Sequence, residues 1–218
     1  MDILVDERTV VVFDLDDTLY NELDYLRSAY LHIARTLAPD DPQGLFVRMF
    51  SLFRSKQDVF GILSDTYGVS KSELIDRYRQ HEPDIKVFDG VMEVIQNIKK
   101  KKGRVAVLTD GRTATQTNKI KALGLYEMLD KLVISEEIGT EKPSEKNYRA
   151  LQEAFNLDVY YYIADNLKKD FITPKQMGWK TAAIIDNGLN IHHETYKYLD
   201  KEHIPHEFFA SFSELNVL

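Results

Sequence analysis

Four acidic side chains follow short apolar runs in this sequence, at points where a sheet would present them along one edge. They are Asp14, Asp16, Asp165 and Asp170. Carboxylates that lie close together repel one another and take up protons unless a cation neutralises them. A hard divalent cation with oxygen ligands, such as Mg²⁺, would remove this conflict. The four acids are therefore candidate metal ligands.

A hydroxyl group and an ammonium group are expected beside these acids. Thr109 ends the second apolar run and is followed by Asp110 and Gly111, and Lys142 lies in a loop after the third run. Mg²⁺, a lysine and a threonine hydroxyl together neutralise and position the oxygens of a phosphoryl group. A helix expected at about 112–123 would add its free N-terminal amides to this phosphate site. In such a site one carboxylate can attack phosphorus, and a second can protonate the leaving oxygen and then activate water.

Five apolar runs are expected to form the strands that position these groups. They span residues 10–13, 105–108, 132–134, 160–164 and 181–185. Each is rich in β-branched or aromatic residues and nearly continuous in hydrophobicity, which is typical of strands buried on both faces of a parallel sheet. Helical patterns separate most of the runs. Strand alternating with helix predicts an α/β fold with a doubly wound parallel sheet, whose ligands bind beyond the carboxyl ends of the strands.

The first interval between strands breaks this alternation. It holds more than 90 residues, far more than one crossover helix needs. The expected helices span residues 22–37, 43–54, 56–67 and 71–80. We therefore expect two domains: an α/β core formed by residues 1–20 and 85–218, and an all-helical insertion formed by residues 21–84.

The composition excludes several classes of protein. Of the 218 residues, 44% are hydrophobic and 29% are charged, as in ordinary globular domains. The 28 basic and 35 acidic residues give a net charge of −7, which argues against broad nucleic-acid binding. There is no cysteine, so disulfides and thiolate metal sites are excluded. With no apolar run of membrane-spanning length and no recognisable signal peptide, we expect a cytoplasmic protein, monomeric or homodimeric, with neither nucleic-acid nor membrane partners.

As a set, these motifs resemble those of the haloacid dehalogenase (HAD) superfamily. The segments that resemble its four motifs in order are Asp14-Leu15-Asp16-Asp17-Thr18, Leu108-Thr109-Asp110-Gly111, Lys142-Pro143, and Asp165 with Asp170. They span most of the chain. The resemblance implies a Rossmann-like core and a hydrolase of the phosphatase branch that requires Mg²⁺. It also implies that the insertion at 21–84 is a helical cap that closes over the substrate.

The resemblance also implies a role for each motif residue. Asp14 would be the nucleophile and a metal ligand, and Asp16 would be the general acid and base, its backbone carbonyl ligating the metal. Asp165 and Asp170 would complete the Mg²⁺ site. The residues assigned to phosphate binding are Thr109, Asp110, Gly111 and Lys142.

Asp16 favours phosphoryl transfer over dehalogenation, because dehalogenating members of the family lack an acid two residues after the nucleophile. The expected substrate is a small phosphorylated metabolite, either a sugar phosphate or a nucleoside monophosphate. A phosphomutase of the β-phosphoglucomutase type remains an alternative, as does a non-catalytic phospho-acceptor or binding scaffold. The sequence departs from the family pattern at Ala164, where glycine is frequent, and at Pro174, where we expect a helix to begin with Thr173 as its N-cap.

Overall fold

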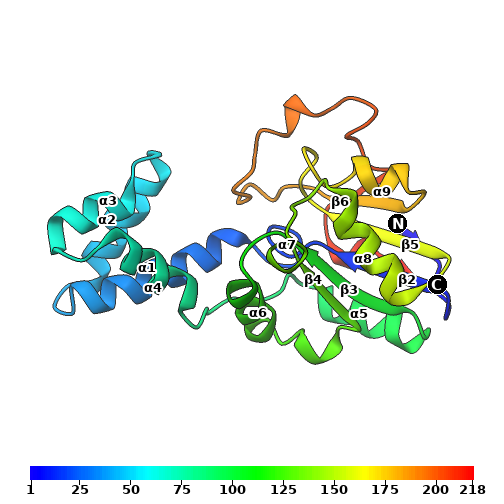
Figure 1. Ribbon diagram of the computed structural model, residues 1–218, viewed down its shortest axis with the longest axis horizontal. Coiled ribbons are helices and arrows are strands. Elements are labelled where there is room, and N and C mark those ends of the chain that lie inside the picture. Colours follow the sequence, from blue (N-terminus) through cyan, green and yellow to red (C-terminus); the bar gives the residue numbers. More distant parts are fainter.

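A parallel sheet of six strands forms the centre of the computed structural model, which describes all residues from Met1 to Leu218 (Figure 1). In spatial order the strands are β4 (Lys131–Ile134), β3 (Arg104–Thr109), β2 (Thr9–Phe13), β5 (Val159–Ala164), β6 (Lys180–Ile184) and β7 (Glu207–Phe209). All five predicted strands are present, and the predicted α/β class with a doubly wound parallel sheet is confirmed. The short edge strand β7 was not predicted.

Strand β2 lies in the middle of the sheet because its side chains are apolar on both faces. Val11 and Phe13 belong to one hydrophobic cluster, and Val10 and Val12 belong to another on the opposite face. All five residues of the strand are buried. The chain adds β3 and β4 on one side of β2 and then returns to add β5 on the other, so the order reverses between β2 and β5. Such a reversal opens a crevice at the carboxyl ends of the two strands.

Helices cover both faces of the sheet. Helices α5 (Val91–Lys100) and α6 (Thr113–Ala122) contribute apolar side chains to the cluster on one face. Helix α8 (Glu145–Phe155) contributes to the cluster on the other face, as do Phe171 and Met177, which flank helix α9 (Ile172–Gln176). A single turn, α7 (Ser135–Ile138), follows β4. Three 3-10 turns (Tyr126–Met128, Thr195–Lys197 and Phe212–Glu214) and a parallel pair of two-residue strands, β1 (Asp2–Ile3) with β8 (Asn216–Val217), complete the core.

Four helices between β2 and α5 stand apart from the sheet, at the left of Figure 1. They are α1 (Glu22–Leu37), α2 (Pro42–Arg54), α3 (Val59–Tyr67) and α4 (Lys71–Gln80). We refer to residues 22–80 as the helical segment. It has a hydrophobic cluster of its own, with ten buried residues such as Ile33, Met49 and Leu74. No helix of the molecule is long and apolar enough to span a bilayer.

Local capping decides where the helices of this segment begin. The side chains of Asp41, Asp58 and Ser70 accept hydrogen bonds from amides in the first turns of α2, α3 and α4. The helix predicted from residue 56 therefore begins at Val59, after its cap, while Lys56 has a positive φ of 55°.

The helix after Asp170 also departs from the prediction. It begins at Ile172 with Phe171 as its N-cap, so Thr173 is not the capping residue. The hydroxyl group of Thr173 instead donates a hydrogen bond to the carbonyl of Pro143. A contact between distant loops thus replaces the local cap that the sequence predicted.

Candidate active site

Three buried carboxylates converge at the crevice between β2 and β5. One oxygen each from Asp14, Asp165 and Asp170 lies within 4.8 Å of the other two. Asp14 and Asp165 follow the last residues of β2 and β5, and their relative exposures are 5% and 7%, while Asp170 is fully buried. Hard carboxylate oxygens in this number and spacing fit a divalent cation such as Mg²⁺.

One ammonium group partly neutralises these acids. Nζ of the buried Lys142 lies 2.7 Å from Oδ1 of Asp14 and 2.8 Å from Oδ1 of Asp170. It also donates to the hydroxyl group of Tyr162 at 3.2 Å, and this tyrosine donates to Asp170. Although burial opposes it, the charges of Asp14 and Asp170 raise the pKa of Lys142 well above its usual value, so this lysine is charged.

The single positive charge of Lys142 does not neutralise the negative charge of three carboxylates. Burial raises the pKa of Asp14 to about 6, although Lys142 opposes the shift. Burial and the charge of Asp14 raise the pKa of Asp165 well above its usual value. The cluster therefore holds excess negative charge that a cation would relieve.

The carboxylate of Asp16 points away from this cluster and toward helix α6. It accepts hydrogen bonds from Nζ of Lys119 at 2.7 Å, from Nε2 of Gln116 at 2.9 Å and from the hydroxyl group of Tyr20. Burial acts to raise the pKa of Asp16, but Lys119 and these hydrogen bonds outweigh it and lower the pKa. Gln116 also donates to Oγ1 of Thr109 at 2.6 Å, so it joins two predicted site residues.

The other predicted phosphate-binding residues have protein partners. Asp110 accepts hydrogen bonds from the amide of Lys142 at 3.0 Å and from Nζ of Lys169 at 2.7 Å. The backbone amide of Gly111 donates to Oγ of Ser135 at 2.9 Å. The backbone amide of Thr113 donates to the carboxylate of Glu136 on α7 at 2.8 Å. Of these two amides only that of Thr113 belongs to the first turn of α6, so one of the amides expected to be free for phosphate has a protein acceptor.

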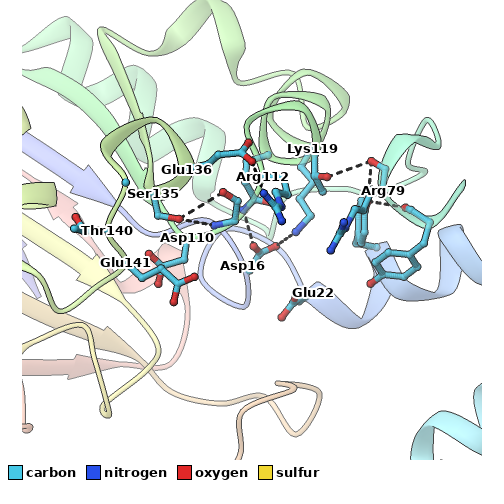
Figure 2. A pocket seen from close by; sticks show the side chains of 16 residues that line it. Asp16, Glu22, Arg79, Asp110, Arg112, Lys119, Ser135, Glu136, Thr140 and Glu141 are labelled. Carbon is cyan, nitrogen blue, oxygen red and sulfur yellow. Dashed lines mark hydrogen bonds and ion pairs between the residues drawn. The ribbon is translucent and has the colours of Figure 1, made fainter. Parts of the chain in front are cut away.

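Two adjoining cavities share Asp16. The smaller, which we call the acidic pocket, has a volume of about 110 Å³ and is lined by Asp14, Asp165 and Thr109 among others. The larger, which we call the cleft, has a volume of about 750 Å³ and lies between the helical segment and the core (Figure 2). Asp16 and Glu22 line both cavities. Burial and the charge of Asp16 raise the pKa of Glu22 to about 8.

The loop after β6 closes one side of the acidic pocket. Nδ2 of Asn190 donates to Oδ2 of Asp165 at 3.0 Å, and the amide of Ile191 donates to Oδ2 of Asp17 at 2.8 Å. His192 lines the pocket beside Lys169, and burial with the nearby lysines lowers the pKa of this histidine. These loop residues were not predicted at the site, because no motif marks them.

Comparisons with known proteins identify the family of this chain. A sequence profile described as haloacid dehalogenase-like hydrolase matches residues 11–184. Pyrophosphatase PpaX from Bacillus cereus strain Q1 is 29% identical over 184 residues, which cover 80% of this chain and 82% of that protein. PpaX from Bacillus thuringiensis strain Al Hakam is 28% identical with the same coverage.

Solved structures share the fold. YfnB from Bacillus subtilis, assigned as a HAD hydrolase and crystallised with magnesium, superposes with a TM-score of 0.64 at 20% identity, covering 94% of this chain and 96% of that one. A HAD phosphatase from Thermococcus onnurineus superposes with a TM-score of 0.60 at 16% identity, covering 94% and 95%.

Proposed function

This chain belongs to the haloacid dehalogenase-like hydrolases and is a phosphatase-type enzyme, and on that premise we propose that it is a Mg²⁺-dependent phosphatase of a small phosphorylated metabolite. The observation that carries the proposal is the buried group of Asp14, Asp165 and Asp170 around Lys142, with Asp16 at the boundary between the acidic pocket and the cleft. A scaffold without catalysis has no need of so many buried charges, which are costly to fold.

The proposed metal ligands are Asp14, Asp165, Asp170 and the backbone carbonyl of Asp16. Bound there, Mg²⁺ would neutralise charge on the phosphoryl oxygens. Lys142 donates to one oxygen of Asp14 and leaves the other free to attack phosphorus. We assign Thr109 and Lys142 to holding the phosphoryl group, with Asp110 and Gly111 shaping the loop beside them.

The proposed reaction has two steps. Asp14 attacks phosphorus, the bond from phosphorus to the leaving oxygen breaks, and Asp16 gives its proton to that oxygen. Asp16 then takes a proton from water, which attacks the aspartyl-phosphate, releases inorganic phosphate and restores Asp14. Lys119 and Gln116 favour the ionised form of Asp16, which is the form that this second step requires, and the first step depends on the fraction of the enzyme in which Asp16 is protonated.

We propose that residues 21–84 form a cap domain and that residues 1–20 and 85–218 form the catalytic core. The separate hydrophobic cluster of the helical segment supports this division, as does the position of the cleft between the two parts. Closure of such a cap would exclude water from Asp14 and Asp16.

Sugar phosphates and nucleoside monophosphates remain the first substrates to test, and inorganic pyrophosphate is a second candidate. The observation that favours pyrophosphate is that the PpaX relatives, named as pyrophosphatases, align over 80% of this chain.

Phosphate release with and without Mg²⁺ tests the proposal. We expect release from at least one sugar phosphate, nucleoside monophosphate or pyrophosphate, its loss in EDTA, and a fall in kcat of at least about 10³-fold in Asp14→Asn. The matched control is Asp40→Asn, an exposed aspartate between α1 and α2, which is expected to retain full activity. No release from any substrate would overturn the phosphatase. An isomerised sugar phosphate without free phosphate would instead indicate the phosphomutase.

A further inference from the structure

We propose that the cleft recognises a leaving group that itself carries negative charge, through Arg79 and Lys119. The substrate class is a phosphate ester or anhydride whose departing part bears a carboxylate or a second phosphate; in pyrophosphate the leaving group is a phosphate. This inference rests on the proposed function, because it concerns the part of the substrate that Asp16 protonates.

Lys119 is a buried cation next to the reaction centre. Its relative exposure is 4%, and it lines the cleft. Its ammonium group has three donors, and one of them has a protein acceptor, Oδ1 of Asp16 at 2.7 Å. A leaving oxygen that is hydrogen-bonded to Asp16 therefore lies within about two hydrogen-bond lengths, or roughly 6 Å, of Nζ of Lys119. An anionic group one to three atoms from that oxygen falls within reach of the remaining donors.

Arg79 reaches the same place from the opposite wall. It lies in the last turn of α4, and the hydroxyl group of Thr115 on α6 donates to its backbone carbonyl at 3.3 Å, which fixes the end of α4 against the core. The side chain of Arg79 is exposed to the cleft, and its guanidinium group has no hydrogen bond or ion pair with the protein. Figure 2 shows Arg79, Arg112 and Lys119 gathered at the end of the cleft that holds Asp16.

The acidic side chains of the cleft do not cancel this charge. Glu136 is paired with Arg112 at 2.6 Å, and Asp110 is paired with Lys169 at 2.7 Å. Burial and the charge of Asp16 raise the pKa of Glu22 to about 8, which weakens its competition for these cations. Glu141 lies toward the other end of the cleft (Figure 2). Lys119 is paired with Asp16 at 2.7 Å, so this end of the cleft keeps Arg79 as a cation without a partner and Lys119 as a paired cation with spare donors.

The cleft offers little to a nucleobase. Its two hydrophobic lining residues are Tyr25 and Tyr78. Nζ of Lys119 lies over the ring of Tyr25, 4.4 Å from the centroid, and so occupies a face on which a base would stack. A compact anionic leaving group fits these walls better than a nucleoside.

A matched pair of probes tests the proposal. 3-Phosphoglycerate has a carboxylate where glycerol 3-phosphate has a hydroxymethyl group, and the two are otherwise alike. We expect the wild-type kcat/KM for phosphate release to be higher for 3-phosphoglycerate by at least about tenfold, the size expected of one charged hydrogen bond. Arg79→Gln and Lys119→Gln should each lower this preference about tenfold.

The control is Arg48→Gln, an exposed arginine on α2 of the helical segment, which should leave the preference unchanged. Binding of both probes to the Asp14→Asn protein, measured by calorimetry, tests the same preference without turnover. Equal use and equal binding of the two probes, or a preference that survives Arg79→Gln, would overturn the inference. Failure of the proposed function looks different: no probe, p-nitrophenyl phosphate included, would release phosphate, whereas the binding preference for 3-phosphoglycerate would persist.

Discussion

At the carboxyl end of β2, a single lysine contacts two of three buried carboxylates. Lys142 pairs with Asp14 and Asp170, while Asp165 accepts a hydrogen bond from the side-chain amide of Asn190. Burial raises the pKa of Asp14 to about 6 although Lys142 opposes the shift, whereas an aspartate in an unfolded chain has a pKa near 3.8. The folded protein therefore binds a proton at Asp14 more tightly than the unfolded chain does.

This difference predicts how stability depends on pH in the absence of metal. Protonated Asp14 favours the folded state below about pH 4, and this contribution is lost as pH rises from about 4 to 6, on the order of 3 kcal/mol in total. We expect Asp14→Asn in EDTA to lose less stability over this range than the wild type, as measured by urea unfolding at several pH values. An equal loss of unfolding free energy in the two proteins over this pH range would contradict the raised pKa of Asp14. Because Mg²⁺ competes with protons for the carboxylates, the stabilisation it gives wild-type protein should grow over the same range.

At the scale of elements, helix α6 connects the predicted motifs. Gln116 spans the distance from Asp16 to Thr109, and Lys119, one turn further along, holds the other oxygen of Asp16. The helix thus orients two groups that come from different strands.

Replacing the side-chain amide of Gln116 tests this orienting role. Gln116→Leu keeps a side chain of similar size but leaves Asp16 and Thr109 each without one donor. We expect kcat to fall about tenfold or more while KM changes little and the helix remains folded. The control is Thr117→Val, at the next position on α6 and half-buried without a side-chain hydrogen bond. Unchanged kcat in Gln116→Leu, or an equal loss in Thr117→Val, would contradict the role.

The sequence predicted site residues that end or follow strands, including Lys142 and Asp170 in the loops beyond, but not those that reach the site from helix α6. Asp14 and Asp165 were predictable because strand ends in a parallel sheet share one edge. Gln116 and Lys119 were not, because a polar residue on a helix gives no local sign of whether it faces solvent or a site. Tyr162 lies within the apolar run 160–164, which was expected to form a buried strand, yet its hydroxyl group contacts both Lys142 and Asp170.

The strands and the helical insertion were also predictable in outline, from hydrophobic runs and from the length of the first interval, whereas the order of the strands in the sheet was not predicted. Strand β7 has three residues, two of them exposed, and so lacks the continuous apolar signal of the other strands. The position of Thr173 depended on a loop 30 residues away, which no local pattern contains.

At the scale of the whole molecule, the core and the helical segment have separate hydrophobic clusters, and only the core holds the carboxylate group. The single tryptophan, Trp179, is buried in the core and stacks on Tyr160 with ring centroids 4.6 Å apart. Its fluorescence therefore reports unfolding of the core, whereas far-UV circular dichroism also reports helices α1–α4.

We expect Mg²⁺ to separate these two signals. Saturating Mg²⁺ should raise the fluorescence-monitored Tm by about 5 °C or more, because the metal binds only the folded core. The Tm of the helical segment, measured by circular dichroism, should not change. Asp170→Asn serves as the control in which Mg²⁺ no longer moves the fluorescence transition. If the fluorescence and circular dichroism curves coincide both without Mg²⁺ and with it, the two parts unfold as one unit.

The strand order has a consequence for synthesis on the ribosome. Strand β2 is made early, but its neighbours β3 and β5 begin at Arg104 and Val159. At 5–20 residues per second, the nascent strand waits roughly 8–30 s for its second partner. During that time the helical segment is completed, and all ten buried residues of its cluster, from Leu23 to Leu74, are already available to pack. The growing chain therefore carries these helices beside a strand that has at most one of its two partners, and this largely apolar strand is the segment that a ribosome-associated chaperone would need to shield.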